Sequence, residues 1–257
     1  NLPYAEVRAR AFSDALLGAP VTGLLPEDKA PDPVLRSAYA YLLGWDHYYA
    51  PQALAHILQH DLIAKVASKP FTLNGKEYPV GTVMIPVQVQ ARNPEEVYTL
   101  VRAAATVSGA PVDAVSTGLT PRGIDLGSRD FEALRRPEVL LLVGEGVSSY
   151  EAGEAWHQLD QRYDVVVTMA ETDKFNRLDL GEYNTIIMVD GSYGPLNNGS
   201  VERLRDWLRT GGLIIAQRDA VQWLRRHNLA HVTVREEPFC PSAAESDSPQ
   251  TTTCPPC

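Results

Sequence analysis

The stretch "NTIIMVDGSYGPLNNGSVERLRDWLRTGGLIIA", residues 184–216, contains a complete strand–helix–strand unit. Its two ends, residues 184–191 and 211–216, are continuous apolar runs of strand length. Residues 200–210, between them, have the apolar spacing of an amphipathic helix that stops at Gly211. Apolar strands joined through a helix indicate a parallel sheet covered on both faces. The stretch therefore predicts an α/β fold.

The same alternation continues on both sides of this unit. Residues 138–146 predict a strand and a glycine-containing turn, and residues 148–163 a helix in which Ser148 and Glu151 are spaced as a capping box. Residues 164–169 predict a further strand, and residues 211–227 a strand, a sharp turn and a helix. We therefore expect a doubly wound, mostly parallel sheet of the flavodoxin-like type.

The chain divides into four parts by composition and pattern. We expect an N-terminal helix and Pro-rich linker at residues 1–35, a first α/β lobe at 36–135, a flavodoxin-like lobe at 136–235 and an irregular tail at 236–257. Within the first lobe, residues 37–44, 62–68, 81–87 and 111–116 predict strands, and residues 51–60 and 93–107 predict helices. Asn93 and Pro94 are typical of a helix N-cap and its first position.

Composition limits the functional classes. Acidic residues outnumber basic ones, 32 to 23, and no basic stripe with interleaved aromatics occurs, so nucleic acid is not an expected partner. The apolar runs are too short to span a bilayer, so we expect no membrane span. The three cysteines, Cys240, Cys254 and Cys257, all lie in the tail, which excludes thiolate chemistry from the body. The chain begins at Asn1 without a signal-peptide pattern, and we expect an excised or processed piece.

Polar residues follow the predicted strands where a doubly wound sheet binds its ligands. The candidate pocket contains Glu145, Gly146, Ser148, Asp190, Tyr193, Arg218 and Asp219. The turn at residues 144–149 can hold an anion at a helix N-terminus, but Glu145 places a negative charge there. A tight turn before a capped helix is the favoured interpretation, and mutual pairing of the polar residues remains an alternative to a ligand site.

Two residue pairs have the spacing of metal ligands. His56 and His60 are four residues apart on a predicted helix, but no Glu lies between them and no third ligand is evident. His157 and Asp160 are one helical turn apart. We interpret both pairs as ordinary helix-surface contacts and expect no metal in this chain.

Four stretches carry a family resemblance: "GKEYPVGTVMIP" (residues 75–86), "GVSSYEAGEAWHQLDQRYDVVVTM" (146–169), "YNTIIMVDGSYG" (183–194) and "LRDWLRTGGLIIA" (204–216). Through them, residues 39–234 resemble the C-terminal region of large zinc carboxypeptidase-like proteins. In these proteins a peptidase domain is followed by a domain resembling class I glutamine amidotransferases. The resemblance implies a secreted or periplasmic protein whose parent reaction is peptide hydrolysis.

The resemblance also implies which chemistry this chain lacks. Such peptidases bind zinc through a His-x-x-Glu pair, and no His here is followed three residues later by Glu, so zinc is implied only for a peptidase domain outside this chain. Active amidotransferases carry a nucleophilic Cys in the turn after the strand at residues 211–216, and Gln217 takes that place here. A glutamine amide is not a nucleophile.

Three functional hypotheses follow. The first is a non-catalytic accessory domain that packs against its own peptidase domain or forms a homodimer. The second is a small-ligand or sugar-binding α/β module that uses the strand-end pocket. The third, a hydrolase, ranks last because the turn at Gln217 offers no nucleophile.

Overall fold

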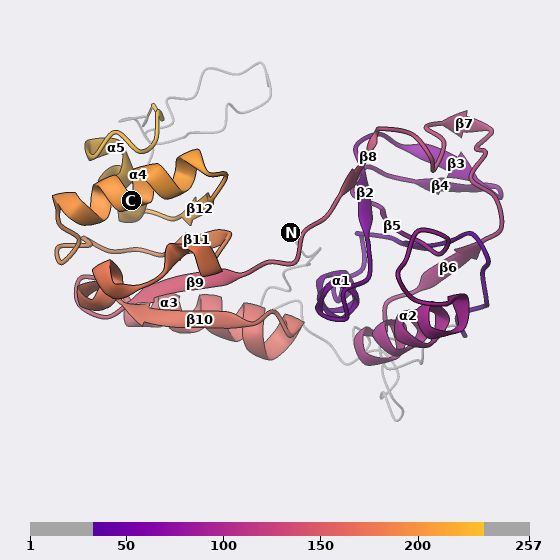
Figure 1. Ribbon diagram of the computed structural model, residues 1–257, viewed down its shortest axis with the longest axis horizontal. Coiled ribbons are helices and arrows are strands. Elements are labelled where there is room, and N and C mark those ends of the chain that lie inside the picture. Colours follow the sequence, from indigo (N-terminus) through magenta and orange to yellow (C-terminus); the bar gives the residue numbers. More distant parts are fainter. Residues whose placement is uncertain (1–32, 234–257) are drawn as a thin grey trace, which may run out of the picture.

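The computed structural model describes residues 33–233, which form two lobes (Figure 1). The predicted N-terminal helix and the tail with its three cysteines lie outside the described residues. The last strand of the first lobe ends at Ala133 and the first strand of the second begins at Val139. The connection at residues 134–138 thus spans the boundary predicted at residue 135.

The first lobe is built on a five-stranded antiparallel sheet with the order β6-β1-β5-β2-β8. Helices α1 (Ala50–Gln59) and α2 (Pro94–Ser108) pack together on one face, against Tyr41 and Ile85. A three-stranded sheet, β4-β3-β7, covers the other face through Phe71 and Tyr78. The strands are β1 (Ala40–Leu43), β2 (Lys65–Ala67), β3 (Phe71–Leu73), β4 (Lys76–Tyr78), β5 (Val83–Pro86), β6 (Val112–Val115), β7 (Arg122–Gly123) and β8 (Phe131–Ala133).

The antiparallel pairing corrects part of the fold prediction. Strands and helices were expected to alternate around a mostly parallel sheet, yet β1 pairs antiparallel with both of its neighbours. Strands β3, β4, β7 and β8 were missed because each has only two or three residues, too few to show a hydrophobic period. This lobe contains both helices and strands, as predicted, but its sheet is antiparallel and not parallel.

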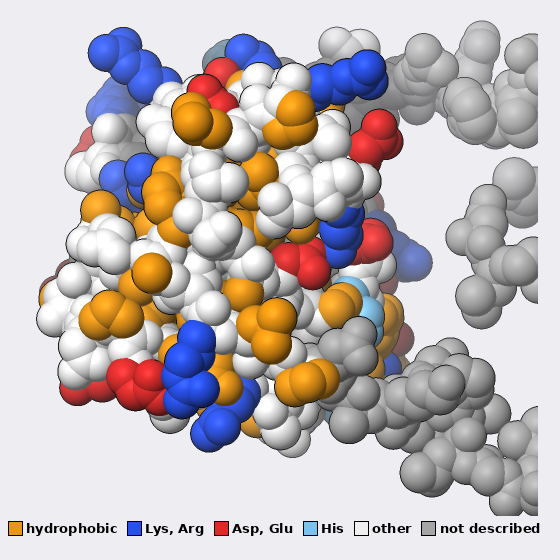
Figure 2. All heavy atoms as spheres, turned by 90° about the vertical axis from the view of Figure 1, so that its right-hand side faces the viewer, with side chains coloured by type: hydrophobic (Ala, Val, Ile, Leu, Met, Phe, Trp, Pro, Cys, Tyr) orange, Lys and Arg blue, Asp and Glu red, His pale blue; other side chains and the backbone are white. Residues whose placement is uncertain are grey.

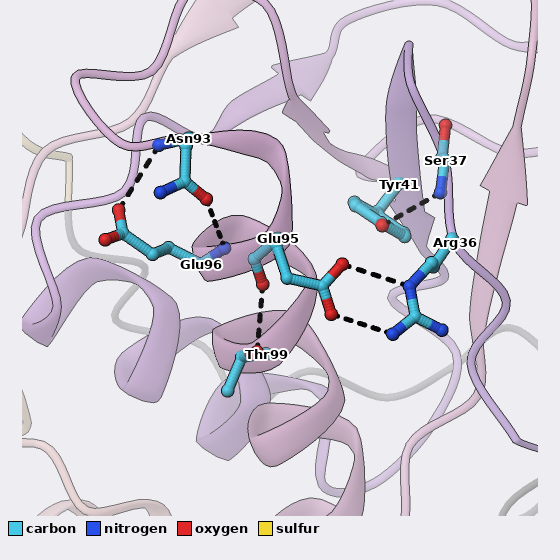
Figure 3. A network of polar contacts seen from close by, with 7 residues as sticks. All are labelled: Arg36, Ser37, Tyr41, Asn93, Glu95, Glu96 and Thr99. Carbon is cyan, nitrogen blue, oxygen red and sulfur yellow. Dashed lines mark hydrogen bonds and ion pairs between the residues drawn. The ribbon is translucent and has the colours of Figure 1, made fainter.

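The N-terminus of α2 confirms the predicted cap (Figure 3). Asn93 Oδ1 accepts a hydrogen bond from the Glu96 N–H at 2.9 Å, and the Glu96 carboxylate accepts one from the Asn93 N–H at 3.2 Å. The neighbouring Glu95 binds the Arg36 guanidinium through two hydrogen bonds of 3.0 and 2.7 Å. This fork joins the segment before β1 to the start of α2.

The second lobe confirms the predicted parallel sheet. Strands β9 (Val139–Val143), β10 (Val167–Glu171), β11 (Thr185–Met188) and β12 (Leu213–Ala216) pair in parallel in the order β10-β9-β11-β12. Helices α4 (Asn198–Arg209) and α5 (Asp219–Arg226) cover one face, where Leu204, Trp207 and Trp223 lie in the core. Helix α3 (Ser149–Trp156) covers part of the other face and continues as a π-helical segment, His157–Arg162.

The two lobes meet through side chains of α1 and the segment before β10. Gln52 Nε2 donates to the Asp164 carboxylate at 2.6 Å, and Gln59 Nε2 donates to the Asp164 carbonyl. The Arg162 guanidinium donates to the Tyr48 hydroxyl at 3.0 Å. Among residues 33–233, no helix has the length and apolar character needed to cross a bilayer.

Candidate functional site

The candidate pocket residues lie at the carboxyl edge of the parallel sheet, in the turns after β9, β11 and β12. From β9 the chain crosses to β10 on one side, and from β10 it returns to β11 on the other side of β9. Connections that leave in opposite directions create a topological switch point, where open α/β sheets bind ligands. The predicted residues are therefore brought to one edge of the sheet, between β9 and β11 and beside β12.

The turns after β9 and β11 are bonded directly to each other. The Gly146 carbonyl accepts from the Ser192 N–H at 2.8 Å and from the Tyr193 N–H at 3.2 Å, and the Ser148 N–H donates to the Asp190 carbonyl at 2.9 Å. Gly146 has φ +77°, and a Cβ there would lie 2.9 Å from Ser192 Oγ, so the close approach requires glycine. The Ser148 N–H, one of the donors at the N-terminus of α3, is already used.

Glu151 on α3 joins the three turns. Its carboxylate, 17% exposed, accepts from the Asp190 N–H at 3.0 Å and lies 3.1 Å from the Arg218 guanidinium. The predicted capping box consequently forms only in part. Ser148 Oγ accepts from the Glu151 N–H at 3.5 Å, but the Glu151 side chain has turned to the neighbouring loop instead of the N-cap backbone. The Asp190 N–H is satisfied in its place.

Arg218 is the strained residue of the turn after β12, with φ 48° and ψ −120°. Such a conformation is costly for a side chain with a Cβ, and sharp strand-to-helix turns of this kind present nucleophiles in α/β hydrolases. Gln217, the residue aligned with the nucleophile by resemblance, comes one position earlier, and its N–H donates to the Met188 carbonyl at 3.0 Å. Neither an amide nor a guanidinium is a nucleophile. The turn has the strained geometry without a reactive group.

Asp190, Asp219 and Tyr193 complete the edge. The Asp190 carboxylate accepts from the Asp219 N–H at 3.1 Å. Tyr193 is fully buried, and its hydroxyl donates to the Val189 carbonyl at 2.8 Å. Burial, followed by the charges of Asp190 and Glu151, raises the pKa of Tyr193 well above its usual value. Tyr193 is thus a neutral part of the core and not a pocket wall.

Three of the candidates, Glu145, Arg218 and Asp219, present exposed side chains at this edge. The Glu145 carbonyl accepts from Thr172 Oγ1 at 2.9 Å, which fixes the turn after β9 to the end of β10. Arg218 is 71% exposed and paired with Glu151. Within residues 33–233 the edge therefore presents the carboxylates of Glu145 and Asp219, which make no ion pair, and the paired guanidinium of Arg218 to solvent.

The structure describes both histidine pairs that have the spacing of metal ligands. Within residues 33–233, no three His, Cys, Asp or Glu side chains gather as metal ligands. The rings of His56 and His60 lie 4.3 Å apart, and His60 Nδ1 is 2.8 Å from the His56 carbonyl. Burial and the neighbouring His60 lower the pKa of His56, whose Nε2 is buried without a partner in the described part of the chain. His157 and Asp160 lie in the π-helical segment.

A cavity of about 330 Å³ lies at the opposite, amino edge of the parallel sheet, between the lobes. Sequence reasoning did not find it, because its walls come from segments far apart in the chain. Its lining residues are Ala55, Gln59, Arg136, Pro137, Glu138, Val139, Val165, Val166, Thr168, Glu182 and Tyr183.

Comparison of the chain with family models, with curated proteins and with solved structures gave no match. The family resemblance therefore rests on the quoted stretches alone.

Proposed function

We propose that this chain is a non-catalytic accessory domain of a zinc carboxypeptidase-like protein, with a second lobe of the flavodoxin-like, amidotransferase-like type. The order β10-β9-β11-β12 corresponds to the first four strands of the flavodoxin order, 2-1-3-4. The observation that carries the proposal is the turn after β12. Gln217 takes the place of the nucleophile by resemblance, and Arg218, which follows it, occupies the strained position and is held by Glu151. Neither side chain is a nucleophile.

Exposed apolar residues suggest where the accessory domain binds its partner. Met169 on β10 is 51% exposed, and Leu213 and Ile215 on β12 are 55% and 45% exposed. Strand residues alternate between faces, so all three lie on the face that carries α3. Met169 lies on one edge strand, whereas Leu213 and Ile215 lie together on the opposite edge strand, β12. Parallel sheets are normally covered on both faces. The missing peptidase domain, or a second copy of this chain, would bind over Leu213 and Ile215 at the β12 edge.

The outer face of the first lobe does not offer such a surface. Figure 2 shows its apolar side chains dispersed among neutral ones, with most charged side chains toward the margin. Protein interfaces need a contiguous patch. This face of the first lobe is therefore not the surface that we propose for the partner.

The alternative function is a small-ligand or sugar-binding module at the strand-end edge. The exposed side chains of Glu145 and Arg218 favour it. However, Glu151 and Asp190 accept hydrogen bonds from the protein itself, and Tyr193 is buried. A ligand would have to replace contacts that already satisfy these groups, so the accessory function is the better supported.

Two forms of the protein test the proposal: this chain, and a form extended N-terminally from its source gene. Zinc content and carboxypeptidase activity are measured on both. We expect the short form to be inactive and free of zinc, and the long form to be active and loaded with zinc. We also expect Ile215→Glu, which places a charge on the proposed partner surface, to lower the stability of the long form. Stoichiometric zinc or peptidase activity in the short form would overturn the proposal.

A further inference from the structure

The cavity at the amino edge is a composite of both lobes. Helix α1 contributes Ala55 and Gln59, and the second lobe contributes residues from the start of β10 and from the segment before β11. The connection between the lobes supplies residues 136–138. A volume of about 330 Å³ is at the lower end of the range for small-molecule sites, which occur preferentially at domain interfaces.

Hydrogen bonds hold the walls in place. Asn184 Oδ1 accepts from the Glu138 N–H at 3.0 Å, and Asn184 Nδ2 donates to the Arg136 carbonyl at 2.8 Å. The Asn184 side chain thus holds the backbone of two residues of the connection. On the other side, Gln59 donates to the Asp164 carbonyl, next to Val165. These contacts fix the backbone of the connection and join α1 to the segment before β10, which reduces the ordering cost of binding.

The lining combines an apolar floor with an excess of negative charge. Ala55, Val139 and Val165 are buried or half-buried and supply apolar surface. Arg136 lies 3.6 Å from Glu138, so these two charges offset each other. Glu182 makes no ion pair within residues 33–233. The net charge of the lining is that of the Glu182 carboxylate.

We propose that this cavity binds a small organic cation, a primary ammonium on a short apolar body. The ammonium pairs with Glu182, and the apolar body packs on Val139 and Val165. Charge-assisted hydrogen bonds to a carboxylate give orientation, and burial of the hydrocarbon gives affinity. This site is separate from the strand-end edge and independent of the accessory function, because it lies at the other edge of the sheet.

Calorimetric titration of the intact chain tests the proposal with three probes that share one hydrocarbon group and differ in the polar group: isoamylamine, isoamyl alcohol and isocaproate. We expect the amine to bind with a Kd in the low millimolar range or below, the alcohol to bind about fivefold more weakly or worse, and the anion not to bind. Equal affinity for amine and alcohol, or no binding of the amine, would overturn the proposal.

Two variants locate the site. Glu182→Gln removes the charge with little change of shape and should weaken amine binding about fivefold. Thr168→Trp places a large ring in the cavity and should abolish binding while the circular dichroism spectrum stays unchanged. Glu154→Gln, an exposed carboxylate on α3 outside the cavity lining, is the matched control and should bind as the parent chain does. Unchanged amine affinity in Glu182→Gln would refute the assignment.

Discussion

Glu151→Ala should destabilise the second lobe more than any other change to an acidic side chain at the strand-end edge. The substitution removes the acceptor of the Asp190 N–H and the partner of Arg218 together. A hydrogen bond to a charged acceptor contributes about 1.5–3 kcal/mol, and the pair with the 71% exposed Arg218 adds at most about 1 kcal/mol. We expect a loss of about 2–3 kcal/mol, or about 10–20 °C in the Tm of a lobe of this size.

Urea unfolding followed by tryptophan fluorescence measures this loss, because Trp156, Trp207 and Trp223 lie in the second lobe and only Trp45 lies in the first. Glu151→Gln keeps an oxygen that can accept from the Asp190 N–H and should cost about 1 kcal/mol or less. Glu154→Ala, on the exposed side of the same helix, should cost almost nothing. If Glu151→Ala were no more damaging than Glu154→Ala, the strand-end turns would not be held together as described.

Three further predictions concern single residues. Arg218→Gly should stabilise the second lobe by up to about 1 kcal/mol in urea unfolding, because the relief of strain at φ 48° exceeds the lost exposed ion pair, whereas Arg218→Ala should not. His56→Gln should reduce the loss of stability between pH 7 and pH 5. The pKa of His56 is lower in the fold than in the unfolded chain, so folding opposes protonation of its ring. Its contribution to stability is present above the unfolded pKa of about 6.5 and is lost as the pH falls below it; an unchanged pH slope would contradict this. Asn93→Ala should cost about 1 kcal/mol by removing the α2 cap, and Asn93→Ser, which restores a capping oxygen, should recover most of it in thermal unfolding.

The parallel sheet of the second lobe could be predicted because its strands are continuous apolar runs and its helices have strong end signals. The first lobe could not be predicted as well, because its additional strands are very short. One signal was nevertheless present. Asn74 and Gly75, with φ of 52° and 78°, form the tight turn between β3 and β4, and an Asn-Gly pair between short runs is a strong hairpin signal. This Asn-Gly pair indicates antiparallel pairing of the two short strands that flank it.

The strand-end residues could be placed at one edge from the sequence, but their partners could not. The spacing of Ser148 and Glu151 predicts a local capping box. In the structure, the Glu151 carboxylate instead accepts a hydrogen bond from the Asp190 N–H, 39 positions along the chain. Likewise, the resemblance singles out Gln217, while the backbone strain falls on Arg218. Both differences arise because pairing between loops is decided by sheet topology, which no local pattern contains.

The two edges of the parallel sheet differ in the pairing of their polar side chains. At the carboxyl edge, the Glu151 carboxylate binds the Asp190 N–H and Arg218, the Asp190 carboxylate binds the Asp219 N–H, and the carboxylates that make no ion pair, those of Glu145 and Asp219, are exposed to solvent. At the amino edge, the walls belong to two lobes, and Glu182 on the second faces no ion-pair partner within residues 33–233. An uncompensated charge beside apolar surface favours a ligand of opposite charge, whereas a satisfied network resists one. If the chain binds a small molecule, the amino edge is therefore the place where its own residues leave room for it.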